Sequence, residues 1–460
     1  MKVGVVGCGH VGLVTAVGFA MSGHRVTGVD LSATIVELIN AGRAPFYEAG
    51  LEKAIADVLR RGTFYATMQV EAVRDADVIL ICVGTPSQND GSVDLTLVHR
   101  AVDDVARLLS HGSHYQVLTI RSTVVPGTTE AVVMPVVNRL RATRTTEIGV
   151  AVNPEFLREG EALSDFLTPD RIVVGELDKR SGDVMAELYK PFLTTLIRTN
   201  IRTAELTKYA MNALLATLIS FSNEIADICE QLNDVDVQNV MAGVHADRRL
   251  SHTVNGQRVR AGIIEYLKPG CGFGGSCLPK DLRALIAFSR CLGLRPILLE
   301  AAHSVNVTRG EHLVDLGESW VGNIEGKTAL VLGLSFKAGT NDIRESPGIV
   351  VAAELLRRGA SVLLADPLVT RNQVIDLLEA GAEFVDDPPG AVNRADLCFI
   401  TTAAPEFRFL ERSIPAEVER VSRPVVIDGR RLLDTAAISQ QAPYLGIGSG
   451  RFRSIRRDRG

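Results

Sequence analysis

The sequence lacks the features that mark secreted, membrane-spanning and nucleic-acid-binding proteins. It has no run of eighteen uncharged apolar residues, the length that a membrane-spanning helix needs. Its start, MKVGVVGCGH, reaches a glycine-rich turn after one lysine, whereas a signal peptide needs a sustained apolar core and a cleavage site. The net charge of −5 leaves no concentrated basic face for nucleic-acid phosphates. We therefore expect a cytoplasmic protein that binds neither membrane nor nucleic acid.

Cysteines are present, but not in the arrangements of disulfide frameworks or metal sites. The seven are an odd number without a repeating spacing, unlike those of a small secreted protein. Cys271 and Cys277 do not form a C-x-x-C pair and have no histidine close by, so we expect no metal. This usage predicts a reducing compartment. Basic residues gather only in the final RFRSIRRDRG, and we expect residues 441–460 to form a flexible, solvated tail.

Strands and helices alternate along the first part of the 460-residue chain, which is long enough for two or three domains. Valine-rich KVGVVG is followed by the helical pattern CGHVGLVTAVGFAMSG and by a second strand, HRVTGVD. Further apolar strands recur at DVILICVG, QVLTIRSTV, EIGVAVNP and RIVVG. This alternation predicts a doubly wound α/β domain over residues 1–202, with a parallel sheet covered by helices on both faces.

A long helix is predicted next, because the segment from Thr203 to Leu232 contains neither proline nor glycine. At 1.5 Å per residue it would be about 45 Å long. Its apolar residues occupy more than one face, so we expect it to connect two domains and to pack against a partner subunit. We assign residues 203–306 to a central helical domain. The alternation restarts at KTALVLGLSFK, which predicts a second, smaller α/β domain over residues 307–440.

The first helix opens on GCGHVG, in which Gly7, Gly9 and Gly12 have G-x-G-x-x-G spacing directly after a strand. The first two glycines permit a tight turn and the close approach of a pyrophosphate, and the third lets helix and strand pack closely. The helix N-terminus favours the anion. Asp30 ends the second strand, where a carboxylate can accept from both ribose hydroxyls and repel a 2′-phosphate. The sequence therefore predicts a dinucleotide site that prefers NAD to NADP.

The segment GFGGSCLPKD leaves more than one interpretation of Cys277 open. A buried structural cysteine is the ordinary expectation for a single cysteine. The flanking residues, however, are polar, glycine-rich and charged, which suits an exposed turn at a helix start, where the helix N-terminus and Lys280 would favour the reactive thiolate. If residues from Leu278 onward are helical, Asp281 lies one turn along, able to hold a water or act as a base. From these residues alone, a nucleophile and a core cysteine are equally supported.

The motifs GCGHVG, NPEFLREG, KYAMN, GFGGSCLPKD and GLSFKAGTNDIRESP occur in this order along the chain. With them, the sequence resembles the UDP-glucose 6-dehydrogenase and GDP-mannose 6-dehydrogenase family of NAD-dependent nucleotide-sugar dehydrogenases. The resemblance implies two Rossmann-like doubly wound domains joined by a long central helix, and a homodimer formed through that helix. It also implies a four-electron oxidation, in which a sugar C6 alcohol becomes a carboxylate while two NAD+ are reduced.

The resemblance also implies a role for Cys277. At the family's nucleophile position, its thiolate would add to the intermediate aldehyde, and the resulting thiohemiacetal would be oxidised to a thioester and hydrolysed. Lys208 and Asn212 lie four residues apart, hence on one face of the long helix, and match the family's pair that stabilises the developing oxyanion.

Further positions match residues that activate water or bind the ligands. Thr123 and Asp281 resemble residues that position water, and Glu159 resembles a proposed base for thioester hydrolysis. The positions that match cofactor contacts are Gly7, Gly9, Val11, Gly12, Asp30, Thr85, Thr123, Glu159, Lys280 and Arg344. The positions that match substrate contacts are Glu155, Phe156, Leu157, Lys208, Asn212, Arg249, Tyr266, Phe273, Gly274, Phe336 and Lys337.

The identity of the sugar depends on less specific positions. The family's GDP-mannose enzymes carry an arginine where Lys268 stands, and lysine cannot make a bidentate guanidinium contact. UDP-glucose is therefore favoured, with GDP-mannose or a UDP-N-acetylhexosamine as alternatives. Arg249 resembles an arginine that is presented across the dimer interface, but the following SHTVNGQRVRAGIIE is longer than in many relatives. Arg258 or Arg260 could take its place.

Two other classes of protein remain as alternatives. A two-electron hydroxy-acid dehydrogenase also has a Rossmann domain and a catalytic lysine and asparagine four apart, but the second α/β domain and the Cys277 segment speak against it. A non-catalytic nucleotide-sugar sensor has no need for Cys277, Lys208, Asn212 and Asp281 together. The sequence therefore predicts an enzyme that converts UDP-glucose to UDP-glucuronate.

Overall fold

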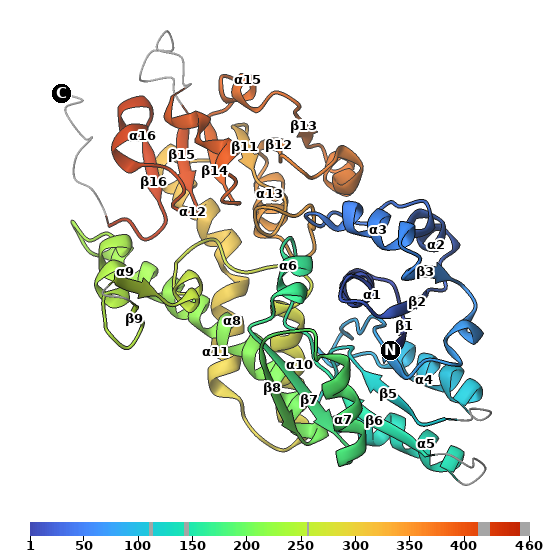
Figure 1. Cartoon of the computed structure of the whole chain (residues 1–460). Helices are drawn as coiled ribbons and strands as arrows, with labels where there is room; N and C mark the ends of the chain where they lie inside the picture. Colours follow the sequence, from blue (N-terminus) through green and yellow to red (C-terminus); the bar gives the residue numbers. More distant parts are fainter. Residues whose placement is uncertain (110–113, 142–146, 255–256, 413–423, 451–460) are drawn as a thin grey trace, which may run out of the picture. The chain divides into compact units, whose positions relative to one another are not determined.

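The computed structural model of the chain describes residues 1–109, 114–141, 147–254, 257–412 and 424–450. The chain divides into two compact units, Met1–Met211 with Ala287–Leu292, and Asn212–Ile286 with Gly293–Gly460. Each unit contains one large sheet with helices packed around it (Figure 1). Among the helices of the described residues, none has the length and apolarity to cross a membrane.

The sheet of the first unit has eight strands in the order β3-β2-β1-β4-β5-β6-β7-β8. In chain order these are β1 (Lys2–Val6), β2 (Arg25–Val29), β3 (Phe64–Thr67), β4 (Val78–Ile81), β5 (Gln116–Ile120), β6 (Ile148–Val152), β7 (Arg171–Glu176) and β8 (Thr195–Thr199). The prediction of a wholly parallel sheet is wrong at one place, because β7 runs antiparallel to β6. The register pairs Val152 with Gly175, so β7 begins beyond the carboxyl end of β6 and the chain turns back from there.

Helices cover this sheet and complete the first unit. They are α1 (His10–Met21), α2 (Ala33–Asn40), α3 (Leu51–Arg60), α4 (Thr96–Leu109), α5 (Met134–Arg141), α6 (Ala162–Leu167) and α7 (Lys179–Leu188), with a 3₁₀ turn η1 (Val70–Val73) and a π turn η2 (Thr129–Val133).

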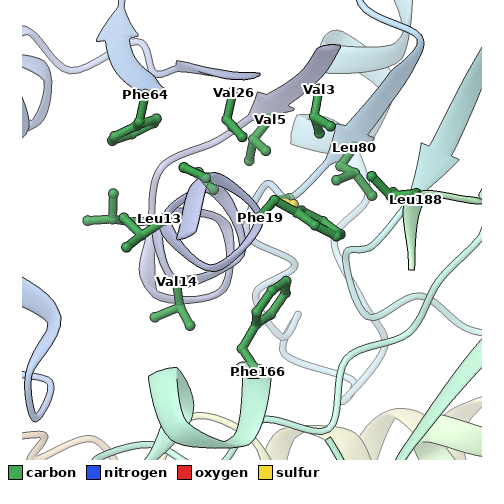
Figure 2. Close-up of a cluster of buried hydrophobic side chains, with 14 of the residues drawn as sticks. Val3, Val5, Leu13, Val14, Phe19, Val26, Phe64, Leu80, Phe166 and Leu188 are labelled. Atoms are coloured by element: carbon green, nitrogen blue, oxygen red, sulfur yellow. The ribbon is translucent and has the colours of Figure 1, made fainter. Parts of the chain in front are cut away.

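The central strands have apolar side chains on both faces, because the sheet has a core on each side. In β4, Val78 and Leu80 join one buried cluster, whereas Ile79 and Ile81 join the other. Figure 2 shows the first cluster around α1, where Phe19 lies edge-on to Phe166 of α6 with ring centroids 5.0 Å apart. Burying one such side chain contributes about 1.5–3 kcal/mol. This two-sided burial explains the uninterrupted valine, isoleucine and leucine runs of the sequence.

The long helix predicted from the sequence is α8 (Ile201–Gln231), 31 residues in length. It begins two residues before the predicted Thr203 and ends one residue before the predicted Leu232. Residues up to Met211 belong to the first unit and those from Asn212 to the second.

The second unit begins with helices and a hairpin. These elements are α9 (Val237–His245), β9 (Ser251–Val254), β10 (Gln257–Arg260), the 3₁₀ turn η3 (Gly262–Tyr266), α10 (Leu278–Cys291), α11 (Ile297–Val307) and α12 (Arg309–Val321). The extra length noted after Arg249 is the antiparallel pair β9 and β10. Residues 287–291 of α10 group with the first unit.

A second, wholly parallel sheet follows, with six strands in the order β13-β12-β11-β14-β15-β16. The strands are β11 (Thr328–Leu332), β12 (Ser361–Ala365), β13 (Glu383–Phe384), β14 (Leu397–Ile400), β15 (Val425–Asp428) and β16 (Tyr444–Gly446). The accompanying helices and 3₁₀ turns are α13 (Pro347–Arg357), η4 (Arg371–Val374), α14 (Ile375–Glu379), α15 (Pro388–Val392), η5 (Pro405–Glu411) and α16 (Thr435–Gln441).

The expected tail from residue 441 is shorter than predicted. Tyr444–Gly446 forms the edge strand β16, paired with β15, and buried Ile447 joins the core of this sheet. The arginine-rich residues 451–460 lie outside the described residues. The fold is thus the predicted one: two Rossmann-like α/β domains joined by a long helix.

Candidate active site

The glycine motif forms the turn between β1 and α1. Gly7 has a left-handed φ of +93°, and a Cβ at Gly12 would lie 1.8 Å from the carbonyl oxygen of Gly7. Those two glycines are therefore needed for the fold itself. A Cβ at Gly9 would meet nothing within 4 Å, so Gly9 leaves open space above the turn. No side chain caps the α1 N-terminus at Gly9, which leaves its first amides available to an anion.

Asp30 holds this turn from the end of β2. Its carboxylate accepts hydrogen bonds from the amides of Cys8 (2.7 Å) and Ser32 (2.9 Å). Each carboxylate oxygen has a further lone pair, so the half-buried group can still accept from a ribose hydroxyl. The open space at Gly9, the uncapped helix and Asp30 together fit a dinucleotide. Val11 is half-buried in the first turn of α1, and Thr85 is buried after β4.

Glu48 supports the same turn and was missed by the sequence analysis. This buried carboxylate accepts from His10 Nε2 at 3.1 Å and from the amides of Gly160 and Ala162, each at 2.8 Å. It therefore ties the start of α1 to the end of the NPEFLREG segment. A single glutamate in an irregular stretch of sequence carries no signal that it will be buried.

The predicted substrate residues Glu155 and Lys208 form a buried ion pair in the first unit. Lys208 Nζ lies 2.8 Å from Glu155 Oε1, and the side chains are 5% and 4% exposed. The amide of Leu157 donates to the other carboxylate oxygen at 2.6 Å. Burial alone would raise the pKa of Glu155, but the charge and hydrogen bond of Lys208 outweigh it and hold the pKa below its ordinary value. The Glu155 carboxyl is therefore ionised at neutral pH.

Phe156 and Glu159 follow on the same segment. Lys208 Nζ lies 5.7 Å and Arg171 Cζ 4.1 Å from the centre of the Phe156 ring, so two cations lie within cation–π distance of this ring. Leu157 packs against the core around α1, and Glu159 is half-buried.

The loop after β5 carries the half-buried Thr123 and is held by α8. The amides of Gly127 and Thr129 donate to Glu205 at 2.6 and 2.9 Å. Burial raises the pKa of Glu205 against the effect of these hydrogen bonds. Glu205 stands almost one turn before Lys208 on α8, so this helix carries both a residue that fixes the Thr123 loop and the lysine of the ion pair.

A second buried network lies beneath NPEFLREG. Arg121, 4% exposed, donates through Nε to Thr15 (2.9 Å) and through Nη1 to the side chains of Asn153 (2.5 Å) and Tyr189 (3.1 Å). Asn153 is the first residue of the segment that carries Glu155, so the network fixes where that segment leaves β6. The sequence analysis did not single out these residues, because their partners are distant in sequence.

In the second unit, Cys277 directly precedes α10 and is exposed. Its Sγ lies 3.5 Å from Ser276 Oγ, and its carbonyl accepts from the amide of Asp281 at 2.9 Å. The prediction that residues from Leu278 are helical is confirmed, and Asp281 stands one turn along. The interpretation of Cys277 as a buried core cysteine is wrong, since the thiol is at the surface of this unit.

The carboxylate of Asp281 joins two other predicted residues, Asn212 and Lys280. It is 1% exposed and accepts from Asn212 Nδ2 and from Lys280 Nζ, each at 2.6 Å. Asn212 and Lys208 occupy successive turns of α8, Lys208 in the first unit and Asn212 in the second.

The glycine-rich segment before Cys277 is held by its backbone. Asn306 of α11 accepts from the amide of Phe273 (2.7 Å) and donates to its carbonyl (3.0 Å). A Cβ at Gly275 would lie 2.9 Å from the Phe336 ring, so only glycine permits this contact. Arg430 donates to the carbonyls of Gly272 (3.1 Å) and Thr401 (2.7 Å). The structure thus brings Gly274 and Gly275 beside Phe336. Asn306 and Arg430, which sequence reasoning missed, hold the same segment.

The remaining predicted residues are more exposed. Lys337 Nζ lies 6.0 Å from the centre of the Phe336 ring. The exposed Arg344 forms a two-pronged contact with Asp342, and Tyr266 is half-buried at the end of η3. Arg249 is 89% exposed and pairs with Asp247, two residues away. Arg249 is therefore not brought to the other predicted residues by any of its described contacts.

Three models of one protein family match the chain in order. They are the NAD binding domain over residues 1–193, the central domain over 202–308 and the UDP binding domain over 330–435 of the UDP-glucose/GDP-mannose dehydrogenase family. The chain belongs to this family.

Relatives of the family match over nearly the whole chain. The UDP-glucose 6-dehydrogenase of Haloferax volcanii is 36% identical, covering 94% of this chain and 97% of that protein. The GDP-mannose 6-dehydrogenase of Pseudomonas syringae pv. syringae is 34% identical, covering 96% and 97%. Among solved structures, the UDP-glucose dehydrogenase of Pyrobaculum islandicum matches with a TM-score of 0.86 and 37% identity, covering 97% of each chain.

Membership in this family makes the protein an NAD-dependent nucleotide-sugar dehydrogenase. The open space at Gly9 and the carboxylate of Asp30 lie in its NAD binding domain. Its UDP binding domain contains Phe336, Lys337 and Arg344. The Cys277 segment, Lys208 and Asn212 belong to the central domain.

Proposed function

We propose that the protein oxidises the C6 hydroxyl of UDP-glucose to the carboxylate of UDP-glucuronate, through a covalent intermediate on Cys277. The observation that supports this most is the exposed thiol at the start of α10, one turn before a buried carboxylate that Asn212 and Lys280 hold in place. A thiol at a helix N-terminus forms a thiolate more readily, and the thiolate is the nucleophile.

The covalent step explains how an alcohol can give an acid by two hydride losses. NAD+, held at the turn of Gly7, Gly9 and Gly12 and by Asp30, would supply the hydride acceptor for both oxidations. The C6 alcohol loses one hydride, and its hydroxyl proton is released, to give the aldehyde; the adduct on the enzyme loses the second hydride. Between these steps, the Cys277 thiolate forms a bond to the aldehyde carbon and the carbonyl oxygen becomes an alkoxide. Loss of hydride from this thiohemiacetal leaves a thioester. Water then adds to the thioester carbon, the C–S bond breaks, and the products are the carboxylate, two protons and the thiolate.

Lys208 and Asn212 are proposed to stabilise the alkoxide. Lys208 and Asn212 are hydrogen-bond donors on one face of α8, and each residue is at most 7% exposed. Donors that are already fixed cost no reorganisation when the charge develops. Lys208 is fixed by Glu155 and Asn212 by Asp281.

Hydrolysis needs a water molecule and a base. We assign Thr123 and Asp281 to positioning the water and Glu159 to taking its proton. The remaining predicted contacts, to cofactor and to substrate, are part of the same proposal. So is the division into domains at residues 1–202, 203–306 and 307–440.

UDP-glucose is preferred to GDP-mannose because of Lys268. This exposed lysine already bonds to Glu265 at 2.5 Å and offers a point charge in place of a two-pronged guanidinium. GDP-mannose and the UDP-N-acetylhexosamines are the alternative substrates.

A homodimer through α8 is also part of the proposal. Leu214, Phe221 and Ile228 are spaced by seven residues and are 46%, 46% and 54% exposed, so they form an apolar stripe on one side of the helix. Ile297 and Leu298 of α11 are each 65% exposed. An apolar stripe on the exposed side of a helix is typical of a face that packs against a partner.

The cytoplasmic location expected from the cysteine usage stays a prediction.

The test of the substrate is a comparison of kcat/KM for NADH formation with UDP-glucose, GDP-mannose, UDP-GlcNAc and UDP-ManNAc. We expect UDP-glucose to exceed the others by at least about tenfold, the discrimination that one lost polar or apolar contact supplies. Cys277→Ser should lose sustained NADH formation with every sugar. Its matched control is Cys291→Ser, because Cys291 is the other exposed cysteine and ends α10. A higher kcat/KM with another of these sugars would overturn the assignment to UDP-glucose.

A further inference from the structure

A turn of the UDP binding domain, residues 342–346, contacts the glycine-rich segment before Cys277 directly. The amide of Gly275 donates to the carbonyl of Arg344 at 2.9 Å. A Cβ at Gly274 would lie only 2.2 Å from the carbonyl oxygen of Glu345. The two backbones therefore approach so closely that residue 274 has no room for a side chain.

Glu345 adopts a backbone conformation that favours glycine. Its φ is +50°, and it is one of three residues other than glycine with positive φ in the described part of the chain. Apart from glycine, few residues other than asparagine and aspartate adopt this region, and such conformations persist where the surrounding structure enforces them. A glutamate at this position therefore indicates a use for its side chain.

The side chain of Glu345 reaches the helix that follows Cys277. Its two carboxylate oxygens accept from Arg283 Nη1 and Nη2 at 2.8 and 2.6 Å. The hydrogen bond with Glu345 raises the pKa of Arg283. Arg283 lies in the second turn of α10, two residues after Asp281. The turn thus holds the glycine-rich segment by its backbone and α10 by an ion pair, one on each side of Cys277 in the sequence.

We propose that Glu345 is a positioning residue for Cys277, and that its ion pair with Arg283 sets where the thiol stands at the start of α10. The proposal rests on the proposed nucleophilic role of Cys277. It gives the turn a task besides the cofactor contact expected of Arg344. Because Arg283 and Glu345 are 27% and 45% exposed, their pair adds little to overall stability, so its loss is expected to leave the protein folded.

A second ion pair, which has no described contact with the Cys277 segment, serves as the matched control. Arg394 and Glu383 have the same two-pronged geometry, at 2.8 and 2.5 Å, and are 53% and 51% exposed. Glu383 lies on β13 and has no contact with the Cys277 segment among the described hydrogen bonds and ion pairs.

The experiment compares the wild type with Glu345→Gln, Arg283→Gln, the exchanged pair Arg283→Glu/Glu345→Arg, and Glu383→Gln. Glutamine at 345 keeps the size and backbone preference of glutamate, so only the ion pair is lost. The two single variants change the local charge in opposite directions. An effect of charge on the thiolate would therefore move their kcat values in opposite directions, whereas loss of position lowers both.

We expect kcat to fall about tenfold in both single variants, as for a small displacement of a reacting group, with smaller changes in the KM of NAD+ and sugar. The exchanged pair recovers much of the loss, and Glu383→Gln behaves as the wild type. Hydrogen exchange of the peptide that contains Gly275 is faster in the single variants and returns toward wild type in the exchanged pair. Thermal unfolding confirms that each variant is folded.

Wild-type kcat and wild-type exchange in both single variants would overturn the proposal. Three other results would also overturn it. They are an equal fall of kcat in Glu383→Gln, kcat changes of opposite sign in the two single variants, and a kcat of the exchanged pair no higher than that of the single variants. Failure of the proposed function would show separately, as an active Cys277→Ser variant. The exchange at Gly275 needs no turnover and would still decide whether the pair holds the segment.

Discussion

Cys277 and Cys291 are exposed thiols at opposite ends of α10, which makes them an internal comparison. The N-terminal end of a helix favours a negative charge and the C-terminal end disfavours it. Iodoacetamide should therefore alkylate Cys277 faster than Cys291 at neutral pH. Peptide mass spectrometry after timed labelling measures both rates in one sample. Equal rates, or the reverse order, would contradict an activated thiol at residue 277.

The buried pair of Lys208 and Glu155 makes a prediction about stability. Lys208→Met leaves a buried carboxylate without its partner and should cost about 3–5 kcal/mol of unfolding free energy. The double variant with Glu155→Gln should lose less, because no charge is then left buried. Urea unfolding near neutral pH measures the three values. Equal stability of Lys208→Met and wild type would show that the pair is not formed.

The same pair makes stability depend on pH. The pKa of Glu155 is held below its ordinary value of 4.5, so the folded protein binds this proton less readily than the unfolded chain. The stabilisation is present above pH 4.5 and is lost as the pH falls through the folded-state pKa. The wild type should therefore lose its advantage over Glu155→Gln when urea unfolding is repeated at a pH below 4.5. A constant difference would contradict the depressed pKa.

At the residue scale, the sequence predicted the groups with local signals and missed those without. Asp281 was predicted because it follows Cys277 by one helical turn, and the structure places it there. Glu48, Glu205 and Arg121 were missed, since each is buried by partners that are distant in the sequence. Burial and long-range hydrogen bonding are properties of the folded chain, and composition around a single residue does not encode them.

Among the elements, the turn between β1 and α1 separates a glycine needed for folding from one that leaves room for a ligand. Gly12→Ala forces a Cβ against the Gly7 carbonyl and should destabilise the protein by at least about 1–3 kcal/mol. Gly9→Ala meets no protein atom within 4 Å and should unfold like the wild type, yet bind NAD+ more weakly. Chemical unfolding and a calorimetric NAD+ titration measure the two effects. Unchanged affinity in Gly9→Ala would contradict binding of the pyrophosphate at this turn.

The apolar stripe of α8 predicts the oligomeric state. Phe221→Glu places a charge in the centre of the proposed interface, and the desolvation of that charge should convert a dimer to a monomer. Ile375→Glu on α14 is the control, because Ile375 is 48% exposed and Phe221 46%. Light scattering after size-exclusion chromatography gives the mass of each. A monomeric wild type, or a dimeric Phe221→Glu, would contradict association through α8.

Most elements could be predicted because their apolar pattern is strong. The buried strand β4 is a continuous apolar run, β1 and β5 are rich in valine, leucine and isoleucine, and α8 is a long stretch without glycine or proline. The two-residue strand β13 and the edge strand β16 were not predicted, since short edge strands have little apolar pattern. The antiparallel direction of β7 was not predicted either, because an apolar run indicates a strand but not the direction in which the strand runs.

For the whole molecule, recurrence of the alternating pattern was enough to predict two α/β domains and a connecting helix. The family models cover the same sequence in the same order, from an NAD binding to a UDP binding domain. The sugar could not be predicted from the sequence alone. Two relatives with similar sequence identity to this chain are named for different substrates, one for UDP-glucose and the other for GDP-mannose. Specificity depends on a few contacts to the sugar, and such contacts leave no long motif.

One enzyme should carry out both oxidations through Cys277. The number of NADH molecules formed per UDP-glucose consumed decides this, measured in the wild type and in Cys277→Ser, with Cys291→Ser as control. We expect two NADH per sugar in the wild type and the control, and no sustained turnover in Cys277→Ser. One NADH per sugar, with an active Cys277→Ser variant, would rule out the covalent route through Cys277.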